Sequence, residues 1–207
     1  MPRKSTFHGG LPVNILGIAG SPRAGGNTEV LLAELLAGAA EVGAETEAVH
    51  LRTCAIHPCT GCERCRKDLT CTRFYDSMHL LYPKIEAADG LIAGSPTYNY
   101  NITPEMKAFI DRLYPYYRFS DERPGPWSTY FAGQGKQALV FSVAEQDDPE
   151  ERGFAIEAMQ RPLEALGFEV TETVHEGGYF PKGAVVRDPA LRKRAREAGR
   201  RFARRLR

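Results

Sequence analysis

The stretch VNILGIAGSPRAGGNT, residues 13–28, decides the fold of this chain. Its first half, residues 13–19, is an apolar run with the length of a buried strand, and it stops at Gly20. Its second half leads into residues 27–42, where apolar residues recur at helical spacing. A buried strand followed at once by a helix is the beginning of an α/β fold.

The loop between this strand and this helix, residues 20–28, has the features of a phosphate site. Glycines let the backbone turn tightly and approach an anion, and the helix start offers N–H groups and a positive dipole end. Side-chain donors and one cation come from Ser21, Arg23, Asn27 and Thr28. The loop therefore predicts a site for a terminal phosphate monoester. It matches neither the P-loop nor the dinucleotide fingerprint, and an ordinary turn capped by Asn27 is the alternative.

The rest of the chain alternates between strand and helix patterns. Further strands are predicted over residues 45–51, 90–94, 136–143 and 168–174. Further helices are predicted over residues 76–88, 103–113, 149–166 and 189–206. Thr103 with Pro104, and Asp188 with Pro189, have the sequence of an N-cap followed by the first helical turn. Five strands alternating with helices predict a parallel sheet covered on both faces, with ligands at the carboxyl ends of the strands.

The domain organisation is simple. Residues 1–12 are predicted to be a flexible leader, and residues 13–207 a single α/β domain. Two segments without a clean period, about residues 53–74 and 114–135, are predicted to be loops inserted into this domain. The second loop is rich in aromatic residues, which favours a subunit contact over a small local core.

A second polar motif, GSPTYNYNITP over residues 94–104, follows the third strand. Its small, polar and aromatic residues can present backbone groups and a Tyr ring to a planar heterocycle. The alternative is a turn rich in Pro and Asn, with Tyr98 in the core. Because this motif and residues 20–28 both follow predicted strands, together they favour ligand binding.

Most of the cysteines fall in one short run, PCTGCERCRKDLTC, residues 58–71. The run contains Cys59, Cys62, Cys65 and Cys71, with gaps of two, two and five residues. Iron–sulfur clusters are held by four cysteine thiolates, so this compact order favours a [4Fe–4S] cluster. A zinc site that includes His57 and a clusterless set of redox-active thiols are the alternatives. Cys54, the remaining cysteine, is predicted to pack as a small apolar residue near a strand end.

Charged residues interleave the cysteines, and basic ones predominate among them: Glu63, Arg64, Arg66, Lys67, Asp68 and Arg73. Positive neighbours favour the more negative reduced state of a cluster and should raise its potential. The alternative is that these side chains only keep a loop soluble.

Composition excludes several classes of function. The 207 residues carry a formal net charge of +1 and have a pI near 7.7, which gives no general attraction to nucleic acid or membrane. Apolar runs are too short to span a bilayer, and the N-terminus lacks a signal peptide's apolar stretch. Five cysteines without an export signal predict a reducing cytoplasm, and the odd cysteine count argues against a disulfide framework. The basic helix over residues 189–206 has an apolar side, which predicts a docked helix with a solvated face and disfavours nucleic-acid binding.

With GSPR at residues 20–23, GNT at 26–28, GSPTYNYNITPEMKAFIDR at 94–112 and the cysteine run between them, the chain resembles the iron–sulfur flavoprotein branch of the flavodoxin-like, NADPH-dependent FMN reductases. The resemblance extends from about residue 15 to residue 112. It implies a flavodoxin-like, three-layer, doubly wound parallel sheet of five strands in the order 2-1-3-4-5, with FMN bound noncovalently.

The resemblance also implies roles for particular residues. It assigns the FMN phosphate to Ser21, Arg23, Asn27 and Thr28. It assigns contacts with the ribityl chain and the ring to Ser95, Pro96, Thr97, Tyr98 and Asn99. It assigns cluster ligation to Cys59, Cys62, Cys65 and Cys71. It further implies an oligomer, a homodimer or homotetramer, in which the cluster approaches the FMN of a neighbouring subunit.

The chain departs from the family pattern in two places. The family has two consecutive acidic residues after the cysteine run, and this chain has Tyr75 and Asp76, so Tyr75 is given no role. The family more often has small, Gly-rich residues after the fourth strand, and this chain has residues 142–148, SVAEQDD. Glu145 and Gln146 could contact the flavin, but a solvated loop is the simpler interpretation.

Three functions are compatible with these observations. The first is an iron–sulfur flavoprotein that exchanges electrons with ferredoxin or a similar carrier and has no catalytic acid, base or nucleophile. The second is a clusterless FMN or quinone reductase that uses NAD(P)H as cosubstrate. The third is a non-enzymatic metal-binding or sensor module built on the flavin fold.

Overall fold

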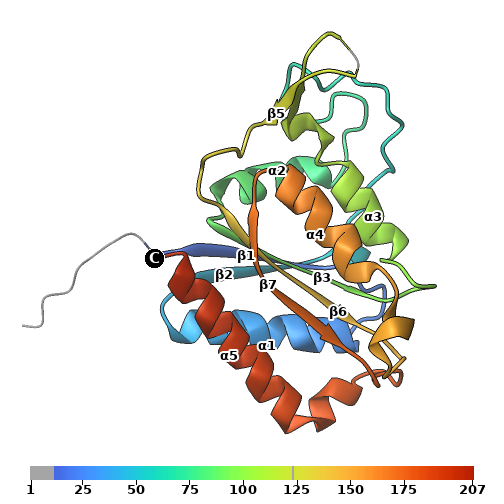
Figure 1. Ribbon diagram of the computed structural model, residues 1–207, viewed down its shortest axis with the longest axis vertical. Coiled ribbons are helices and arrows are strands. Elements are labelled where there is room, and N and C mark those ends of the chain that lie inside the picture. The colour runs from blue at the N-terminus through green and yellow to red at the C-terminus, as the bar shows by residue number, and fades with distance from the viewer. Residues whose placement is uncertain (1–11, 123) are drawn as a thin grey trace, which may run out of the picture.

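A central parallel sheet forms the middle layer of the molecule (Figure 1). The computed structural model describes residues 12–122 and 124–207, so the predicted leader, apart from Pro12, lies outside the described residues. The strands of this sheet lie in the order β2-β1-β3-β6-β7. Because β6 and β7 are the fourth and fifth strands of the sheet along the chain, this confirms the expected order 2-1-3-4-5. All neighbouring strands in it are parallel. The strands are β1 (Asn14–Ala19), β2 (Glu45–His50), β3 (Gly90–Pro96), β6 (Gln137–Val143) and β7 (Glu169–Glu176).

Helices cover both faces of the sheet, as its apolar strands require. The central strands β1, β3 and β6 are almost entirely buried, because each presents apolar side chains to both layers of helices. One face packs on α1 (Asn27–Glu41) and α5 (Pro189–Arg205). The other face packs on α2 (Met78–Ala87), α3 (Pro104–Asp111) and α4 (Ala155–Ala165). Two apolar cores result, one on each side of the sheet.

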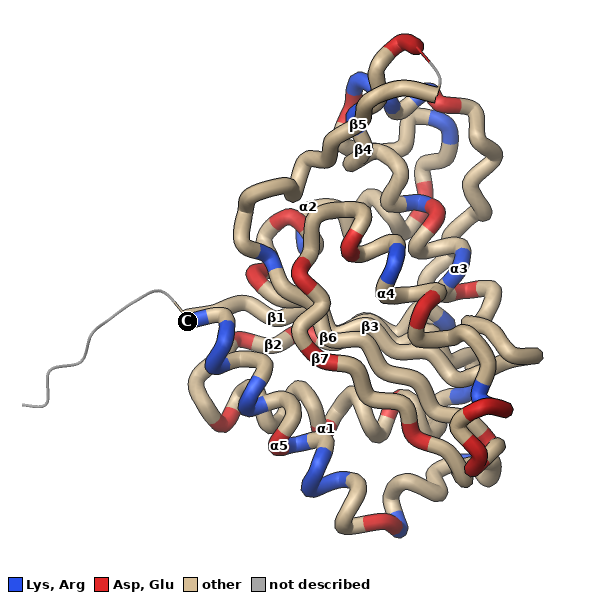
Figure 2. The backbone as a smooth tube through the Cα atoms, viewed as in Figure 1, with Lys and Arg blue, Asp and Glu red and all other residues tan. Residues whose placement is uncertain are grey.

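The C-terminal helix α5 docks through its apolar side, as predicted. Leu191, Ala195, Ala198 and Phe202 are buried, and their spacing places them on one helical face. The basic side of α5, marked in blue in Figure 2, meets carboxylates of α1 as well as solvent. Glu34, which is mostly buried, lies 2.6 Å from a guanidinium nitrogen of Arg192 and equally close to one of Arg196. Part of the predicted solvated face is therefore an inter-helix ion-pair network.

Helices α1 and α5 approach closely at two glycines. A Cβ atom built on Gly38 would lie 1.9 Å from the Arg196 carbonyl oxygen. A Cβ atom built on Gly199 would lie 1.9 Å from the Leu35 carbonyl oxygen. Any side chain at either position would push the two backbones apart, so glycine allows this close contact.

The predicted inserted loops pack together into one lobe, which stands above α2, α3 and α4 in Figure 1. We call residues 54–77, 114–122 and 124–130 the cysteine lobe. Arg66 Nη2 donates to the carbonyl oxygens of Phe119 and Ser120 at 3.2 and 3.0 Å. Tyr114 Oη donates to Glu63 at 3.0 Å. These contacts join the cysteine segment to the aromatic segment.

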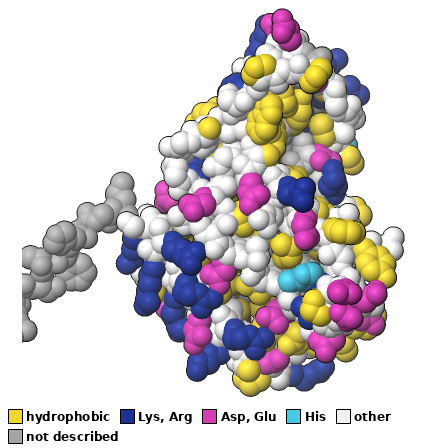
Figure 3. Space-filling model, viewed as in Figure 1, with side chains coloured by type: hydrophobic (Ala, Val, Ile, Leu, Met, Phe, Trp, Pro, Cys, Tyr) yellow, Lys and Arg dark blue, Asp and Glu magenta, His cyan; other side chains and the backbone are white. Residues whose placement is uncertain are grey.

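The aromatic segment contains a hairpin that the sequence did not reveal. Strands β4 (Tyr117–Phe119) and β5 (Trp127–Thr129) pair antiparallel. Each has only three residues, which is too short for an alternating pattern to stand out. Tyr116 is buried, while Trp127 is half exposed, and Figure 3 shows hydrophobic side chains gathered over this part of the lobe. The segment thus forms a local core and an exposed aromatic surface; a subunit contact there stays a prediction.

The predicted helix over residues 149–166 is interrupted. A short 3₁₀ turn spans Pro149–Arg152, and α4 begins only at Ala155. Between them Gly153 has φ +68°, and a Cβ atom there would lie 2.3 Å from the Tyr100 carbonyl oxygen. The close approach of that loop breaks the helix. Among the described residues, no helix combines the length and apolar character needed to cross a bilayer.

Candidate functional site

A cavity of about 370 Å³ opens at the carboxyl ends of β1, β3 and β6. Its lining comprises Ser21, Arg23, Gly26, Asn27, Thr28, Pro96, Thr97, Tyr98, Asn99, Val143, Glu145, Tyr179, Phe180 and Lys182. All the residues predicted to bind a cofactor line it, except Ser95. Tertiary structure therefore brings the two polar motifs to one cavity, at the edge of the sheet where parallel α/β folds bind ligands.

The first wall of the cavity is the loop between β1 and α1. Ser21 and Thr28 are almost fully buried at its base. Helix α1 begins at Asn27 after Gly26, and no side chain caps it. The first N–H groups of a helix have no partner inside the helix, so this end of α1 offers donors to an anion. The Gly25 N–H is already used, because it donates to Glu29 Oε2 at 2.9 Å.

Asn27 contacts a distant segment of the chain. Its Nδ2 donates to the carbonyl oxygens of Tyr179 and Pro181 at 2.9 and 3.0 Å. Its Oδ1 accepts from the Val185 N–H at 3.2 Å. The side chain that the sequence assigned to a phosphate thus fastens the segment after β7 to the beginning of α1.

The second wall is the loop after β3, and Ser95 supports it from below. Ser95 is fully buried; its Oγ accepts from the Thr103 N–H at 3.1 Å and donates to the Pro96 carbonyl oxygen at 2.9 Å. Thr103 in turn donates to the Gly20 carbonyl oxygen at 2.6 Å. Ser95 and Thr103 therefore tie the two walls together behind the cavity.

A tight turn presents Tyr98 and Asn99 to the cavity. Tyr98 and Asn101 pair through two backbone hydrogen bonds of 2.7 and 3.0 Å, while Asn99 and Tyr100 have φ +48° and +65°. Positive φ at both central residues is the geometry of a type I′ turn, and Tyr adopts it only at some cost. The Phe154 N–H, which donates to the Tyr100 carbonyl oxygen at 2.7 Å, holds this conformation.

Six lining residues were not predicted to bind: Gly26, Val143, Glu145, Tyr179, Phe180 and Lys182. Glu145, expected in a solvated loop, is exposed yet lines the cavity, whereas Gln146 does not. Tyr179, Phe180 and Lys182 follow β7 and carry no motif. The rule that ligands bind at carboxyl ends of strands was the one available signal for them.

A second cavity lies in the cysteine lobe. All four cysteines of the run line it, together with Arg64, Arg73 and Phe74 of the same segment and Asp111, Arg112 and Tyr114 of α3 and the residues that follow it. Cys65 is buried, Cys71 half-buried, and Cys59 and Cys62 exposed. As the described side chains stand, no group of three or more His, Cys, Asp or Glu residues is arranged to hold a metal ion.

The remaining cysteine and the neighbouring histidine stay outside this cavity. Cys54 is half-buried, with Sγ 3.7 Å from the His50 carbonyl oxygen at the end of β2. The His57 ring is mostly exposed and stacks on Phe74, with centroids 4.9 Å apart. Cys54 therefore packs near a strand end, as predicted.

The surroundings of the cysteines shift the thiol pKa values of Cys65 and Cys62 in opposite directions. Burial, followed by the charges of Cys71, Cys59 and Cys62, raises the pKa of the Cys65 thiol to about 11. By contrast, the Arg64 N–H lowers the pKa of Cys62. Four thiolates in one place repel one another unless a positive centre lies between them. A positive centre between the sulfur atoms would favour the thiolate form of these cysteines.

A buried ion pair closes the base of the cysteine segment. Arg112 binds Asp76 through two hydrogen bonds of 2.7 and 3.1 Å, and both side chains are almost fully buried. Arg112 also donates to the His57 carbonyl oxygen at 2.8 Å, and the His57 N–H donates to Asp76 at 3.0 Å. One guanidinium thus holds both stems of the segment at the end of α3.

Because of this ion pair, we expect the stability of the chain to decrease at acidic pH. Burial raises the pKa of Asp76, but the Arg112 guanidinium and the N–H groups of His57 and Met78 outweigh it, lowering the pKa from 3.8 to about 2. The resulting stability is complete above pH 4 and lost as pH falls toward 2. We expect the free energy of unfolding to fall by about 2 kcal/mol across that window through this group. Denaturant unfolding at several pH values checks this; an Asp76→Asn variant should lack this component.

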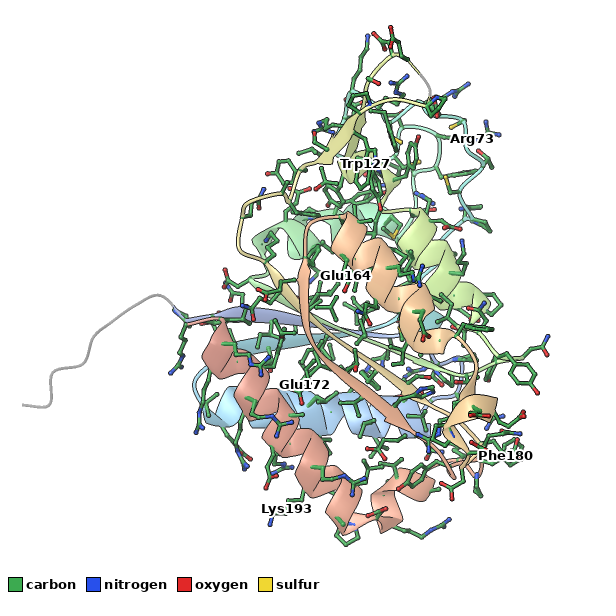
Figure 4. The ribbon with its side chains drawn as sticks, viewed as in Figure 1. Arg73, Trp127, Glu164, Glu172, Phe180 and Lys193 are labelled. Carbon is green, nitrogen blue, oxygen red and sulfur yellow. The ribbon has the colours of Figure 1, made fainter. Side chains whose placement is uncertain are left out.

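Helix α3 separates the two cavities. Its N-cap Thr103 contacts the loops of the first cavity, and Asp111 and Arg112, at its other end, line the second. The cavities share no lining residue. An eight-residue helix is about 12 Å long. Figure 4 likewise shows Arg73 of the cysteine lobe and Phe180 of the first cavity in separate parts of the molecule.

Comparison with known proteins relates this geometry to a family. The family model for NADPH-dependent FMN reductases matches residues 13–147, more than half of the chain. The chain is 38% identical over 103 residues to an iron–sulfur flavoprotein of Methanocaldococcus jannaschii, covering 50% of this chain and 53% of that protein. It is 41% identical over 101 residues to one of Archaeoglobus fulgidus, covering 49% and 46%.

The similarity to solved structures concerns the fold. A flavodoxin from the domain Archaea superposes with a TM-score of 0.58 at 12% identity, over 94% of this chain and 99% of that one. The flavodoxin-like fold is confirmed by this match and by the strand order. The chain spans about half the length of the curated relatives it matches. It belongs to the NADPH-dependent FMN reductase family, and over about half of its length it is similar to iron–sulfur flavoproteins.

Proposed function

We propose that the chain is an FMN-dependent oxidoreductase that passes electrons between a [4Fe–4S] cluster, FMN and a carrier such as ferredoxin. FMN binds in the cavity at the carboxyl ends of the strands, and Cys59, Cys62, Cys65 and Cys71 hold the cluster. A flavin exchanges one or two electrons and a cluster exchanges one, so the pair joins two-electron and one-electron chemistry. The observation that carries the proposal is that all four cysteines of the run line one cavity.

The first cavity suits FMN in shape and polarity. Its phosphate end combines the beginning of α1 with Arg23 and the buried hydroxyls of Ser21 and Thr28. Another wall presents Pro96, Thr97, Tyr98 and Asn99 from the loop after β3. A volume of about 370 Å³ is within the range of small-molecule sites.

The second cavity brings together the type of ligand and the positive charge that favour a cluster. Two of its cysteines are exposed, so a bound cluster would have an edge toward solvent from which a carrier could take or give electrons. Arg64 and Arg73 line the same cavity, and their charge would favour the reduced state. Electron transfer requires the cluster and the FMN to lie close together. In this proposal, a homodimer or homotetramer places the cluster of one chain opposite the FMN of a neighbouring chain.

A clusterless reductase using NAD(P)H is the second candidate. The arrangement of the described cysteines, which is not one that could hold a metal ion, favours it. A third candidate, a metal-binding or sensor module, requires neither flavin turnover nor a redox cluster. The five free cysteines support a reducing compartment, and we propose the cytoplasm.

Metal and flavin content test the proposal directly. After anaerobic purification we expect about four irons and four sulfides per chain, with one FMN. FMN without iron, together with rapid oxidation of NAD(P)H, would establish the second candidate. Absence of both iron and FMN would overturn the proposal in favour of the third.

A further inference from the structure

We propose that residues 179–182 form a third wall at the phosphate end of the cavity, in which Lys182 binds the phosphate and Asn27 is a positioning residue. This inference rests on the proposed binding of FMN. It assigns Asn27 a role other than that of a phosphate ligand, and it assigns the phosphate a ligand that no motif marks.

The position of this wall is set by Asn27. Three hydrogen bonds join the Asn27 side chain to the backbone of Tyr179, Pro181 and Val185, at 2.9 to 3.2 Å. They span more than 150 positions of the sequence. With its amide nitrogen shared between two carbonyl oxygens and its oxygen accepting an N–H, Asn27 acts mainly on the protein backbone.

Phe180 braces Arg23 on this wall. The Arg23 guanidinium carbon lies 5.6 Å from the centroid of the Phe180 ring, and Nη1 lies 3.5 Å from the Phe180 carbonyl oxygen. Figure 4 shows Phe180 beyond the carboxyl end of β7. Phe180 is 56% exposed and lines the cavity. Its contact with Arg23 restricts a long side chain that would otherwise be mobile.

Lys182 lies against the phosphate loop. A Cβ atom built on Gly25 would lie 3.6 Å from Lys182 Cε. A Cβ atom built on Gly183 would lie 3.8 Å from the Gly25 carbonyl oxygen, so the two segments pack closely at this point. Both Arg23 and Lys182 line the cavity.

The phosphate needs a second cation because one backbone N–H donor of the phosphate loop is already bonded within the protein. The Gly25 N–H donates to Glu29, whose carboxylate also pairs with Arg52 at 3.1 Å. A phosphate monoester carries nearly two negative charges at neutral pH. Arg23 and Lys182 together supply two positive charges at the N-terminus of α1. Lys182 thereby supplies a hydrogen-bond donor in place of the Gly25 N–H, which is bonded to Glu29.

The experiment compares FMN with riboflavin, which lacks the phosphate. Dissociation constants are measured by flavin fluorescence on the full chain after removal of bound flavin. A Lys182→Ala variant should bind FMN roughly 10- to 100-fold more weakly and riboflavin unchanged. An Arg23→Ala variant should show the same selectivity. Lys193→Ala is the matched control, since Lys193 is exposed on α5 away from this cavity, and should change neither constant.

Asn27→Ala tests positioning. Hydrogen exchange of residues 179–185 should accelerate in the flavin-free variant. FMN binding should weaken by about the same factor as in the Lys182→Ala variant. In that background, Lys182→Ala should have a smaller effect than in the natural chain, because Lys182 is no longer held in place. Unchanged exchange and additive effects would make Asn27 an ordinary ligand and overturn its assigned role.

The outcomes separate this inference from the function beneath it. A natural chain that binds neither flavin overturns both. A natural chain that binds FMN, with a Lys182→Ala variant that binds it equally well, overturns the inference alone. An equal loss of FMN and riboflavin in that variant would show general damage to the cavity and also reject phosphate recognition by Lys182.

Discussion

A Cys62→Ala variant is expected to lose its iron, falling from about four to less than one per chain, and to keep its FMN. Cys62 is exposed in the cysteine lobe, so removing its sulfur removes a ligand without opening a hole in a core. The flavin cavity shares no lining residue with the cysteine cavity, so its affinity should not change. Iron, acid-labile sulfide and flavin are measured on the anaerobically purified variant.

Cys54→Ala is the matched control for this prediction. Cys54 lies in the same lobe but does not line the cysteine cavity. Its replacement should leave iron, sulfide and FMN at the levels of the natural chain. Equal iron in Cys62→Ala and Cys54→Ala would reject the assigned ligands, and equal loss in both would mean that the lobe responds to any change of a thiol.

Asp76→Asn is expected to destabilise the chain by about 3–5 kcal/mol at neutral pH. The change leaves the Arg112 guanidinium buried without its counter-charge, and Arg112 Nε already lacks a hydrogen-bond partner among the described residues. An unpaired buried charge loses its hydration without compensation. Unfolding in urea, with the free energy extrapolated to water, measures the effect.

Lys107→Gln, on α3, provides the comparison with an exposed ion pair. Lys107 and Asp111 also form an ion pair, but their side chains are 60% and 41% exposed. Breaking a pair that remains in water should cost less than about 1 kcal/mol. Similar losses in Asp76→Asn and Lys107→Gln would contradict the view that burial gives the Asp76–Arg112 pair its importance. Hydrogen exchange should also rise in the cysteine segment of Asp76→Asn alone, because that pair joins its two stems.

Much of the fold follows from local patterns in the chain. The five predicted strands became the five strands of the main sheet, and the order of strands and helices is as predicted. Thr103 caps α3 by accepting from the Met106 N–H, and Asp188 caps α5 by accepting from the Leu191 N–H. Caps and periods involve residues a few positions apart, so a single sequence reveals them.

The candidate site was predictable in part, for the same reason. Residues in the two loop motifs converge on one cavity because the carboxyl ends of parallel strands share an edge. Ser95 belongs to a motif yet supports the loop from behind, because its position in the strand turns its hydroxyl toward Thr103. A motif selects a stretch of chain, whereas the direction of each side chain depends on what packs around it.

The sequence by itself determined the alternation of strands and helices, the phosphate loop, the loop after β3 and the compact set of cysteines. Only the tertiary structure decided that Asn27 fastens residues 179–185, that Arg112 joins both stems of the cysteine segment, and that α3 separates the two cavities. Local spacing fixes contacts within a few residues. These other contacts join residues tens to more than a hundred positions apart, and they form only when the sheet brings distant segments together.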